Sequence, residues 1–307
     1  MKPDRIRFPM LFERQKRLLA LVDALGGEVG GLDFQKLLFL YCCEDEDTPT
    51  YEFVPYRFGG FSFTSYADKR RLIDRGLLVA EERAWKLTPA GKVAARIAPA
   101  ERLRMDRFAR RLAGQRGDAL VVVAYRQHPY YATRSKMAER LLAGDRSALQ
   151  AIESARPAAK PPGLCTIGYE GATLESYLNR LLRDGVTLLC DVRRNPLSRK
   201  YGFSKGTLSK ACEGVGIRYE HLPELGIASE ERRELKTQAD YDALFTVYER
   251  ENLPKQTKAL ATIRTWIQDG ERVALTCFEK LPHQCHRHCV AEALERAAGQ
   301  RRRTVHL

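Results

Sequence analysis

Reactive and charged residues end or follow three short apolar runs in the second half of the sequence. The runs, at 163–169, 186–192 and 272–277, have the length and apolar content of buried strands. Carboxylates can transfer protons, and a guanidinium can bind a phosphate through two parallel hydrogen bonds. The pattern therefore predicts a site for a phosphate-bearing substrate. The residues concerned are Gly168, Tyr169, Asp191, Arg193, Arg194, Cys277 and Glu279.

Three of these residues are the predicted catalytic groups. Asp191 and Glu279 are expected to act as general base and acid, or one of them to stabilise an oxocarbenium ion during N-glycosidic cleavage. Cys277 is expected to act as a nucleophile if a cation or a helix N-terminus stabilises its thiolate. Each has a structural alternative: Asp191 can pair with Arg193, Cys277 can fill the core, and Glu279 can orient Arg287.

Substrate binding is predicted for the strand ends and for two further segments. One is the loop at 193–203, which carries arginines and a serine. The other is the start of a helix expected at 285–298, whose free N–H groups and positive dipole end suit an anion. The predicted phosphate- or substrate-binding residues are Gly168, Tyr169, Arg193, Arg194, Ser198, Arg199, Cys285, His286 and Arg287.

The segment at 283–289 also has the composition of a metal site, with three histidines and two cysteines. Cys285 and Cys289 are four residues apart and can share a helical face, and zinc uses such ligands. No second CxxC or HxxxH half-site lies nearby, and only Cys277 is available to complete the set. We therefore predict no metal and no cofactor, and expect the segment to cap a helix and bind an anion.

Helical patterns separate the apolar runs, and this alternation predicts an α/β domain at 164–307 with a three-layer, mostly parallel sheet. In open sheets of this kind, ligands bind beyond the carboxyl ends of the strands, at a switch in strand order. The residues above should meet there. Helices are expected at 173–183, 204–213, 241–269 and 285–298, and further strands at 217–222 and 304–307.

This second domain resembles the domain of unknown function family 488. One departure is Tyr169, where the family more often carries a histidine followed by a serine, so a role of that imidazole cannot be carried over. The resemblance implies a shared site without a settled reaction. The matching pieces are Thr166–Tyr169, Asp191–Arg193 with Pro196 and Ser198, Gly216–Tyr219 with Leu225 and Gly226, and Cys277–Glu279 with Cys285–Arg287.

The first 98 residues predict a winged helix-turn-helix. Three helices are expected at 12–25, 34–41 and 62–75, followed by a ribbon of two strands at 77–82 and 84–87. In such a domain the third helix can enter the major groove while the ribbon contacts phosphate. The alternative is a dimerisation or docking module whose cations are merely solvated.

The same region resembles the Panacea-type antitoxin domain in Leu32–Phe39, Phe53–Gly59 and Arg75–Leu78. That resemblance implies toxin neutralisation, phage defence or DNA binding. Residues 99–155 are expected to form a helical connector with a dense basic helix, and the proline-rich stretch at 156–163 a linker. The predicted nucleic-acid-binding residues are Lys69, Arg70, Arg71, Arg83, Lys86, Arg104, Arg107 and Arg111.

Composition supports a polyanionic partner. The chain of 307 residues has 52 Lys and Arg against 39 Asp and Glu, a net charge of +13, and most of the excess falls in the first 160 residues. An Arg-rich solvated surface is the alternative. The eight cysteines lack a secreted framework, and neither a signal core nor a membrane-length apolar run is present. We expect thiols, a cytoplasmic location and no membrane partner.

Together these features predict a nucleic-acid-binding protein, with DNA the favoured partner. Its α/β domain is expected to hydrolyse a glycosidic or phosphoryl bond of a nucleotide or nucleic acid, in phage defence or in the control of DNA modification. One alternative is a non-enzymatic regulator or sensor whose second domain binds a nucleotide. Another is a protein-interaction module with a vestigial site. Winged-helix domains often act in pairs, so a homodimer is one possible state of the protein.

Overall fold

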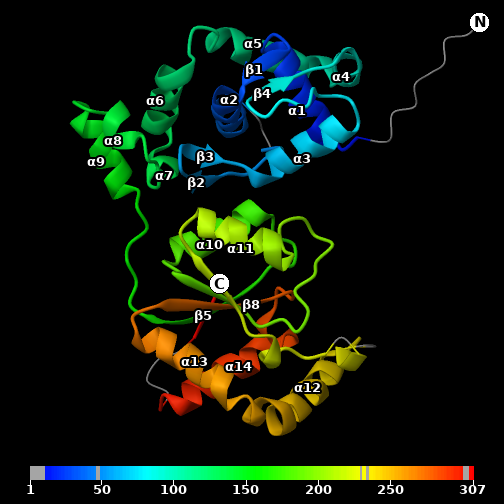
Figure 1. The fold of residues 1–307 in the computed structure, drawn as a ribbon, viewed down its shortest axis with the longest axis vertical. Coiled ribbons are helices and arrows are strands. Elements are labelled where there is room, and N and C mark those ends of the chain that lie inside the picture. Colours follow the sequence, from blue (N-terminus) through cyan, green and yellow to red (C-terminus); the bar gives the residue numbers. More distant parts are fainter. Residues whose placement is uncertain (1–10, 46–48, 229, 233–234, 300–303) are drawn as a thin grey trace, which may run out of the picture. The chain divides into compact units, whose positions relative to one another are not determined.

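A computed structural model describes residues 11–45, 49–228, 230–232, 235–299 and 304–307. The chain divides into two compact units, Met1–Arg156 and Pro157–Leu307, each with its own fold (Figure 1). The division falls at the start of the proline-rich stretch that the sequence analysis interprets as a linker. In the described part of the chain, no helix is both long enough and apolar enough to cross a bilayer.

The first unit has a helical core built around α2, which is buried along most of its length. Phe34, Leu37 and Phe39 on α2 are fully buried, and Met105 and Phe108 from the predicted connector join the same apolar cluster. Residues 99–155 therefore pack into the first unit, because α5 buries its apolar face on α1, and α6 does so on α2. The helices are α1 (Glu13–Ala24), α2 (Gly31–Glu44), α3 (Phe63–Asp74), α4 (Pro89–Ala94), α5 (Pro99–Arg111), α6 (Gly117–Gln127), α7 (Pro129–Ala132), α8 (Ala138–Leu141) and α9 (Arg146–Ser154).

Two small antiparallel sheets complete this unit. Strand β1 (Glu28–Gly30) pairs with β4 (Ala84–Lys86), and β2 (Val54–Tyr56) forms a hairpin with β3 (Gly59–Phe61). The hairpin was not predicted. The strand expected at 77–82 is not formed, and a single bridge joins Leu78 to Leu87. An irregular turn with a bend at 82–83 takes its place, and the Lys69 ammonium donates hydrogen bonds to the carbonyl groups of residues 81, 82 and 84.

The second unit contains a five-stranded parallel sheet in the order β7-β6-β8-β5-β9. The mixed α/β fold class with a mostly parallel C-terminal sheet is thus confirmed. The three inner strands, β6, β8 and β5, are buried along almost their whole length because helices cover both faces. The strands are β5 (Gly163–Gly168), β6 (Leu188–Asp191), β7 (Arg218–His221), β8 (Arg272–Cys277) and β9 (Val305–His306).

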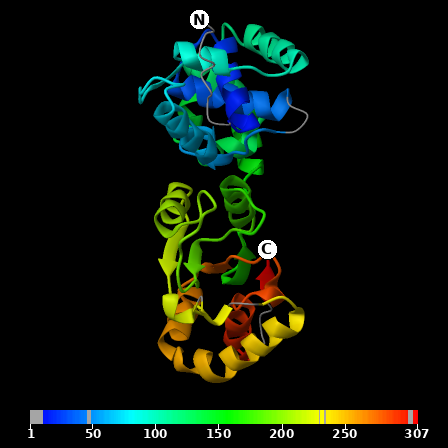
Figure 2. The same cartoon turned by 90° about the vertical axis from the view of Figure 1, so that its right-hand side faces the viewer.

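Helices form the outer layers of this unit. Figure 1 shows α10 (Leu174–Arg183) and α11 (Lys205–Gly214) on one face, and α13 (Thr257–Gln268) and α14 (Arg287–Ala297) on the other; the turned view in Figure 2 shows the same layers. The chain therefore changes face between β7 and β8. This change places a switch point at β8, between β6 and β5. The other elements are α12 (Gln238–Val247), the π-helical turn η3 (Tyr248–Asn252) and the 3₁₀ turns η1 (Pro223–Leu225), η2 (Glu230–Arg232), η4 (Leu253–Lys255) and η5 (Pro282–Gln284).

Candidate functional site

The carboxyl ends of β5, β8 and β6 lie next to one another in the sheet. Gly168 is paired with Cys277, and Asp191 is paired with Thr276, one residue before Cys277. The three polar strand ends singled out by the sequence therefore meet at the switch point, where open α/β sheets bind ligands. Their side chains differ greatly in exposure, and exposure decides which of them a substrate can reach.

Asp191 and Arg193 form a buried ion pair. Arg193 donates from Nε to Asp191 Oδ1 at 2.8 Å and from Nη2 to Oδ2 at 2.5 Å. Its Nη1 donates to the Tyr169 hydroxyl at 2.9 Å and to the Phe203 carbonyl at 2.8 Å. Burial lowers the pKa of Arg193, but the hydrogen bonds and charge of Asp191 outweigh this effect and raise the pKa above its usual value.

Asp191 also accepts a hydrogen bond, at 2.6 Å, from the Tyr219 hydroxyl. Burial and the Asp191 charge raise the pKa of Tyr219, so this hydroxyl remains a donor. Both Asp191 carboxylate oxygens thus accept hydrogen bonds, and the Arg193 guanidinium binds both of them. This geometry favours the structural alternative, in which Asp191 and Arg193 hold the strand ends, over the predicted base and phosphate ligand.

Tyr169 belongs to the same scaffold. Its ring is 3% exposed and stacks on Phe203 at a centroid distance of 4.4 Å. Phe278, which meets Tyr169 edge to face, is 42% exposed. Of these two aromatic residues, only Phe278 presents a ring surface to a ligand.

Arg287 is fully buried and holds the loop that follows β8. Its Nη1 donates to the Glu279 carbonyl at 2.6 Å and its Nη2 to the Lys280 carbonyl at 3.0 Å. Glu279 thus contacts Arg287 through its backbone carbonyl. Gly168 is needed beneath this loop, because a Cβ there would lie 1.9 Å from the Glu279 carbonyl oxygen. Arg287 and Gly168 therefore position the loop, and neither faces an open anion site.

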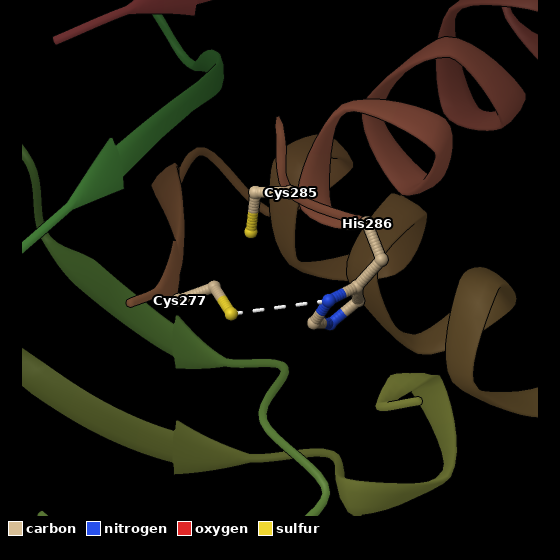
Figure 3. A group of neighbouring side chains, drawn as sticks. All are labelled: Cys277, Cys285 and His286. Atoms are coloured by element: carbon tan, nitrogen blue, oxygen red, sulfur yellow. Dashed lines mark hydrogen bonds between the residues drawn. The ribbon is translucent and has the colours of Figure 1, made fainter. Parts of the chain in front are cut away.

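Cys277, Cys285 and His286 converge at the end of β8 (Figure 3). The three potential ligand atoms all lie within 4.8 Å of one another, and all three residues are buried. His286 Nε2 lies 3.0 Å from the Val192 carbonyl, which only accepts, so Nε2 carries the proton. In the neutral ring Nδ1 is then the acceptor nitrogen, and it faces the Cys277 sulfur at 3.8 Å.

These thiols do not have the surroundings of an exposed nucleophile. Cys277 has no exposed surface, so no substrate atom reaches its sulfur in this arrangement. Burial and the neighbouring Cys277 raise the pKa of Cys285 to about 12, which keeps it a thiol at neutral pH. Cys289, which the spacing had paired with Cys285, contacts His288 instead. All eight cysteines lie in the described part of the chain, and no disulfide joins them.

The exposed rim of the site is basic and apolar. Arg194 and Arg199 are exposed on the loop after β6, and Lys200 is bound at 3.3 Å to the Tyr169 carbonyl. Burial lowers the pKa of Lys200. Ser198, also in the predicted set, accepts a hydrogen bond from the Lys200 amide and thereby shapes this loop. Leu197 is 75% exposed among these cations.

His221, the last residue of β7, lies at the site but is not among the residues predicted from the sequence. It is paired in register with Asp191, its Nε2 donates to the Arg193 carbonyl at 2.9 Å, and its Nδ1 lies 3.1 Å from the Lys205 ammonium. Its position at the end of a predicted strand was the available signal. Unlike Asp191, His221 is only partly buried.

The predicted nucleic-acid-binding residues of the first unit separate by burial. Lys69 is 4% exposed, lies over the Trp85 ring and donates to the Ala84 carbonyl at 2.6 Å, so its charge is used inside the unit. Arg70 and Arg83 are exposed. The other members have these environments: Arg71 is exposed 3.7 Å from Asp68, Lys86 pairs with Glu28, Arg104 binds the Asp45 carbonyl, Arg107 is exposed, and Arg111 pairs with Glu44 and Asp45.

An open parallel sheet with helices on both faces defines the second unit as an α/β domain, and its polar switch point lies at the edge where domains of this kind bind their ligands. Residues 173–294 match the family model described as domain of unknown function DUF488. The match includes β6, β7, β8 and most of α14, and therefore the residues of the site after β5. No curated protein and no solved structure matches the chain.

Proposed function

We propose that the protein is a nucleic-acid-directed hydrolase whose α/β unit cleaves a glycosidic or phosphoryl bond of a phosphate-bearing substrate. The proposal rests mainly on one observation, the exposed basic rim at the switch point. Arg194 and Arg199 extend from the loop that the buried Asp191–Arg193 pair holds in place. A rigidly held loop with exposed guanidinium groups suits the binding of a phosphate. Phe278, whose exposed ring contacts Tyr169, suits the stacking of a nucleobase.

The roles within this proposal follow exposure. Arg194 and Arg199 bind phosphate, and Asp191, Arg193 and Tyr169 position their loop. Glu279 is 7% exposed and His221 is partly buried, whereas Asp191 has no exposed surface. These two titratable groups at the edge of the scaffold are therefore the candidates for proton transfer. This assignment keeps the predicted reaction class but moves the catalytic emphasis from Asp191 to these two residues.

The first unit would supply the nucleic-acid affinity. Its order is helix, strand, helix, hairpin, helix and a strand that pairs with the first one, and apart from the inserted hairpin this order supports a winged-helix interpretation. Arg70 and Arg71 are exposed on α3, and Arg83 is exposed just before β4. The resemblance of this region to antitoxin domains extends the proposal to phage defence or the control of DNA modification. Replacing Arg70 and Arg71 by alanine should weaken DNA binding and reduce its salt slope by about one for each phosphate that the variant no longer binds. Lys69 is left intact because its removal would disrupt the turn.

The test of the hydrolase proposal uses the full chain with labelled single- and double-stranded DNA and RNA, base-modified DNA and free nucleotides, assayed for released bases and strand breaks. Product should fall strongly in Arg194→Ala/Arg199→Ala and in separate Glu279→Gln and His221→Gln variants. The matched control removes two exposed cations of α13, Lys258 and Arg264, by the same substitution. Absence of product from every substrate, or an equal decrease in the control, would reject the proposal.

One observation favours a second candidate function, a ligand-controlled regulator. The first unit has a cavity of about 790 Å³ with Lys36 in its wall. The Lys36 ammonium is buried, and in the described structure it has one hydrogen-bond acceptor, the Gly60 carbonyl at 3.0 Å. A planar anion would supply the missing acceptors and pack against the surrounding rings. The cavity is also lined by Tyr56, Arg57, Phe61, Tyr66 and Arg83.

This second function has its own test. Nucleoside mono-, di- and triphosphates should raise the melting temperature of the wild-type chain and change its DNA affinity, and Lys36→Met should abolish both effects. A ligand effect that persists in Lys36→Met would place the ligand elsewhere, for instance at the rim of the α/β unit, which Arg194→Ala/Arg199→Ala would then abolish.

A further inference from the structure

The buried cluster at the end of β8 has the composition and geometry of a metal site. It combines two thiols and an imidazole from two segments, the end of β8 and the turn that leads into α14 (Figure 3). Zinc binds sulfur at about 2.3 Å and nitrogen at about 2.0–2.1 Å, so two ligands of a tetrahedral site lie about 3.6 Å apart. The 3.8 Å between Cys277 Sγ and His286 Nδ1 is close to that separation.

The orientation of His286 is an independent observation that points to a ligand. Metal-binding histidines usually donate their second ring N–H to a carbonyl or carboxylate, which fixes the tautomer and aims the other nitrogen at the metal. His286 does this through Nε2 and the Val192 carbonyl, at 3.0 Å. Because Val192 follows directly on β6, the sheet itself holds the imidazole in place. Nδ1 is left directed at the two sulfur atoms.

We propose that Cys277, Cys285 and His286 bind one borderline-soft divalent cation, zinc by preference, at the carboxyl end of β8. Each cysteine releases its thiol proton to solvent on binding, and the neutral imidazole donates its Nδ1 lone pair. A divalent cation with two thiolates and one neutral imidazole has no net charge. Such a neutral centre is compatible with residues of which at most 1% is exposed, whereas an isolated cation or thiolate there would be strongly disfavoured.

The same donors decide against other metals. Magnesium and calcium prefer oxygen ligands, whereas thiolate and imidazole suit zinc and its neighbours. Three protein ligands would leave one coordination position of a tetrahedral site open, and the Glu279 carboxylate lies next to the cluster, with Oε2 3.5 Å from the Cys277 sulfur. The inference does not depend on the hydrolase proposal, because a metal here would also tie β8 to α14 in a protein without catalytic activity.

The experiment measures metal bound to the full chain. The purified protein is treated with a chelator, titrated with Zn²⁺ against a chromophoric competitor, and separately loaded with Co²⁺ to detect thiolate-to-cobalt charge transfer. We expect about one metal per chain, and a decrease in affinity of at least about tenfold in Cys277→Ser, Cys285→Ser and His286→Gln. Cys289→Ser and Cys212→Ser are the matched controls, because both residues are buried cysteines outside the cluster.

A measurement on the unmutated chain keeps the inference testable if the variants misfold. The X-ray absorption fine structure of the zinc-loaded protein should show two sulfur ligands and lighter donors. A shell of nitrogen and oxygen alone, or of four sulfurs, would contradict the proposed ligands. The inference would also be overturned by an equal decrease in affinity in Cys289→Ser and Cys285→Ser, by a chain that binds no stoichiometric zinc, or by a Cys277–Cys285 disulfide in place of the metal.

Discussion

Burial separates the charged residues that a ligand can reach from those that hold the fold. Asp191, Arg193 and Arg287 lie at the predicted site, yet each is buried and hydrogen-bonded within the unit. Lys69 is similarly engaged in the first unit. By contrast, Arg194 and Arg199 were predicted on the same grounds and are exposed. Residue type alone does not distinguish the two groups, because a charge becomes available or buried only through its packing.

Breaking the Asp191–Arg193 pair should destabilise the α/β unit. Asp191→Asn removes the negative charge and leaves the buried guanidinium without a counter-charge, a change that costs about 3–5 kcal/mol in comparable pairs. The free energy of opening is measured from the urea dependence of amide exchange in β6. The control is Glu220→Gln on β7, where a partly exposed carboxylate lies 3.7 Å from Arg218. It should change stability by no more than about 0.5 kcal/mol, and equal effects would contradict the structural role of the pair.

Lys36 should make the stability of the first unit depend on pH. Burial lowers its pKa from 10.5 to about 7. Between the folded and the unfolded pKa of Lys36, the unfolded chain binds more protons than the folded one. The free energy of unfolding should therefore rise with pH in this range, by up to about 1.4 kcal/mol per pH unit. Below the folded pKa both states are protonated, and the cost of burying the charge is then fully present.

The measurement is urea unfolding between pH 7 and pH 10 in a Trp266→Phe background, in which the buried Trp85 reports the first unit. Lys36→Met should be more stable near neutral pH, and its stability should not show the rise. The same slope in Lys36→Met would assign the pH dependence to other groups.

Secondary-structure elements were predictable where a periodic pattern ran through them. The strand at 272–277 agrees with β8 residue for residue, and the helix at 173–183 agrees with α10 to within one position, because Thr173 caps it. Shorter elements failed. The hairpin of β2 and β3 has three-residue strands, too short for a periodic signal, and the expected strand at 77–82 is a turn held by Lys69.

Glycine at the end of β5 should be irreplaceable, since a Cβ on Gly168 would collide with the Glu279 carbonyl oxygen at 1.9 Å. Gly168→Ala should therefore cost about 1–3 kcal/mol or more and increase amide exchange in the loop after β8. Gly206→Ala is the matched control, because a Cβ on this exposed glycine of α11 would meet nothing within 4 Å. It should stabilise the protein by about 0.5–1 kcal/mol. Destabilisation by both variants alike would show that the close approach at Gly168 is not decisive.

At the scale of the whole molecule, the chain forms two units with separate cores. The arginine-rich helix α5, expected in a connector, belongs to the first unit, and two of its arginines pair with acidic residues of that unit. Arg102 pairs with Asp23, and Arg111 pairs with Glu44 and Asp45. The basic surplus of the sequence is thus partly used in internal ion pairs, which reduces the surface available to a polyanion.

Limited proteolysis should separate the two units at the proline-rich stretch. Ala158 and Ala159 are exposed and lie outside helix and strand, so elastase should cut there first and release two folded fragments of similar size. Trypsin should spare this stretch, because Arg156 and Lys160 both precede proline. Initial cleavage within 99–155 would contradict the packing of that region into the first unit.

The sequence by itself determined the succession of strands and helices along the second unit and the presence of polar residues at the strand ends. Both follow from the local spacing of apolar side chains. Only the tertiary structure decided that Cys277 lies against Cys285 and His286, that Asp191 is hydrogen-bonded to Arg193 and Tyr219, and that Lys36 borders a cavity. These arrangements depend on contacts between segments far apart in the chain, and on burial, which no local pattern of residues specifies.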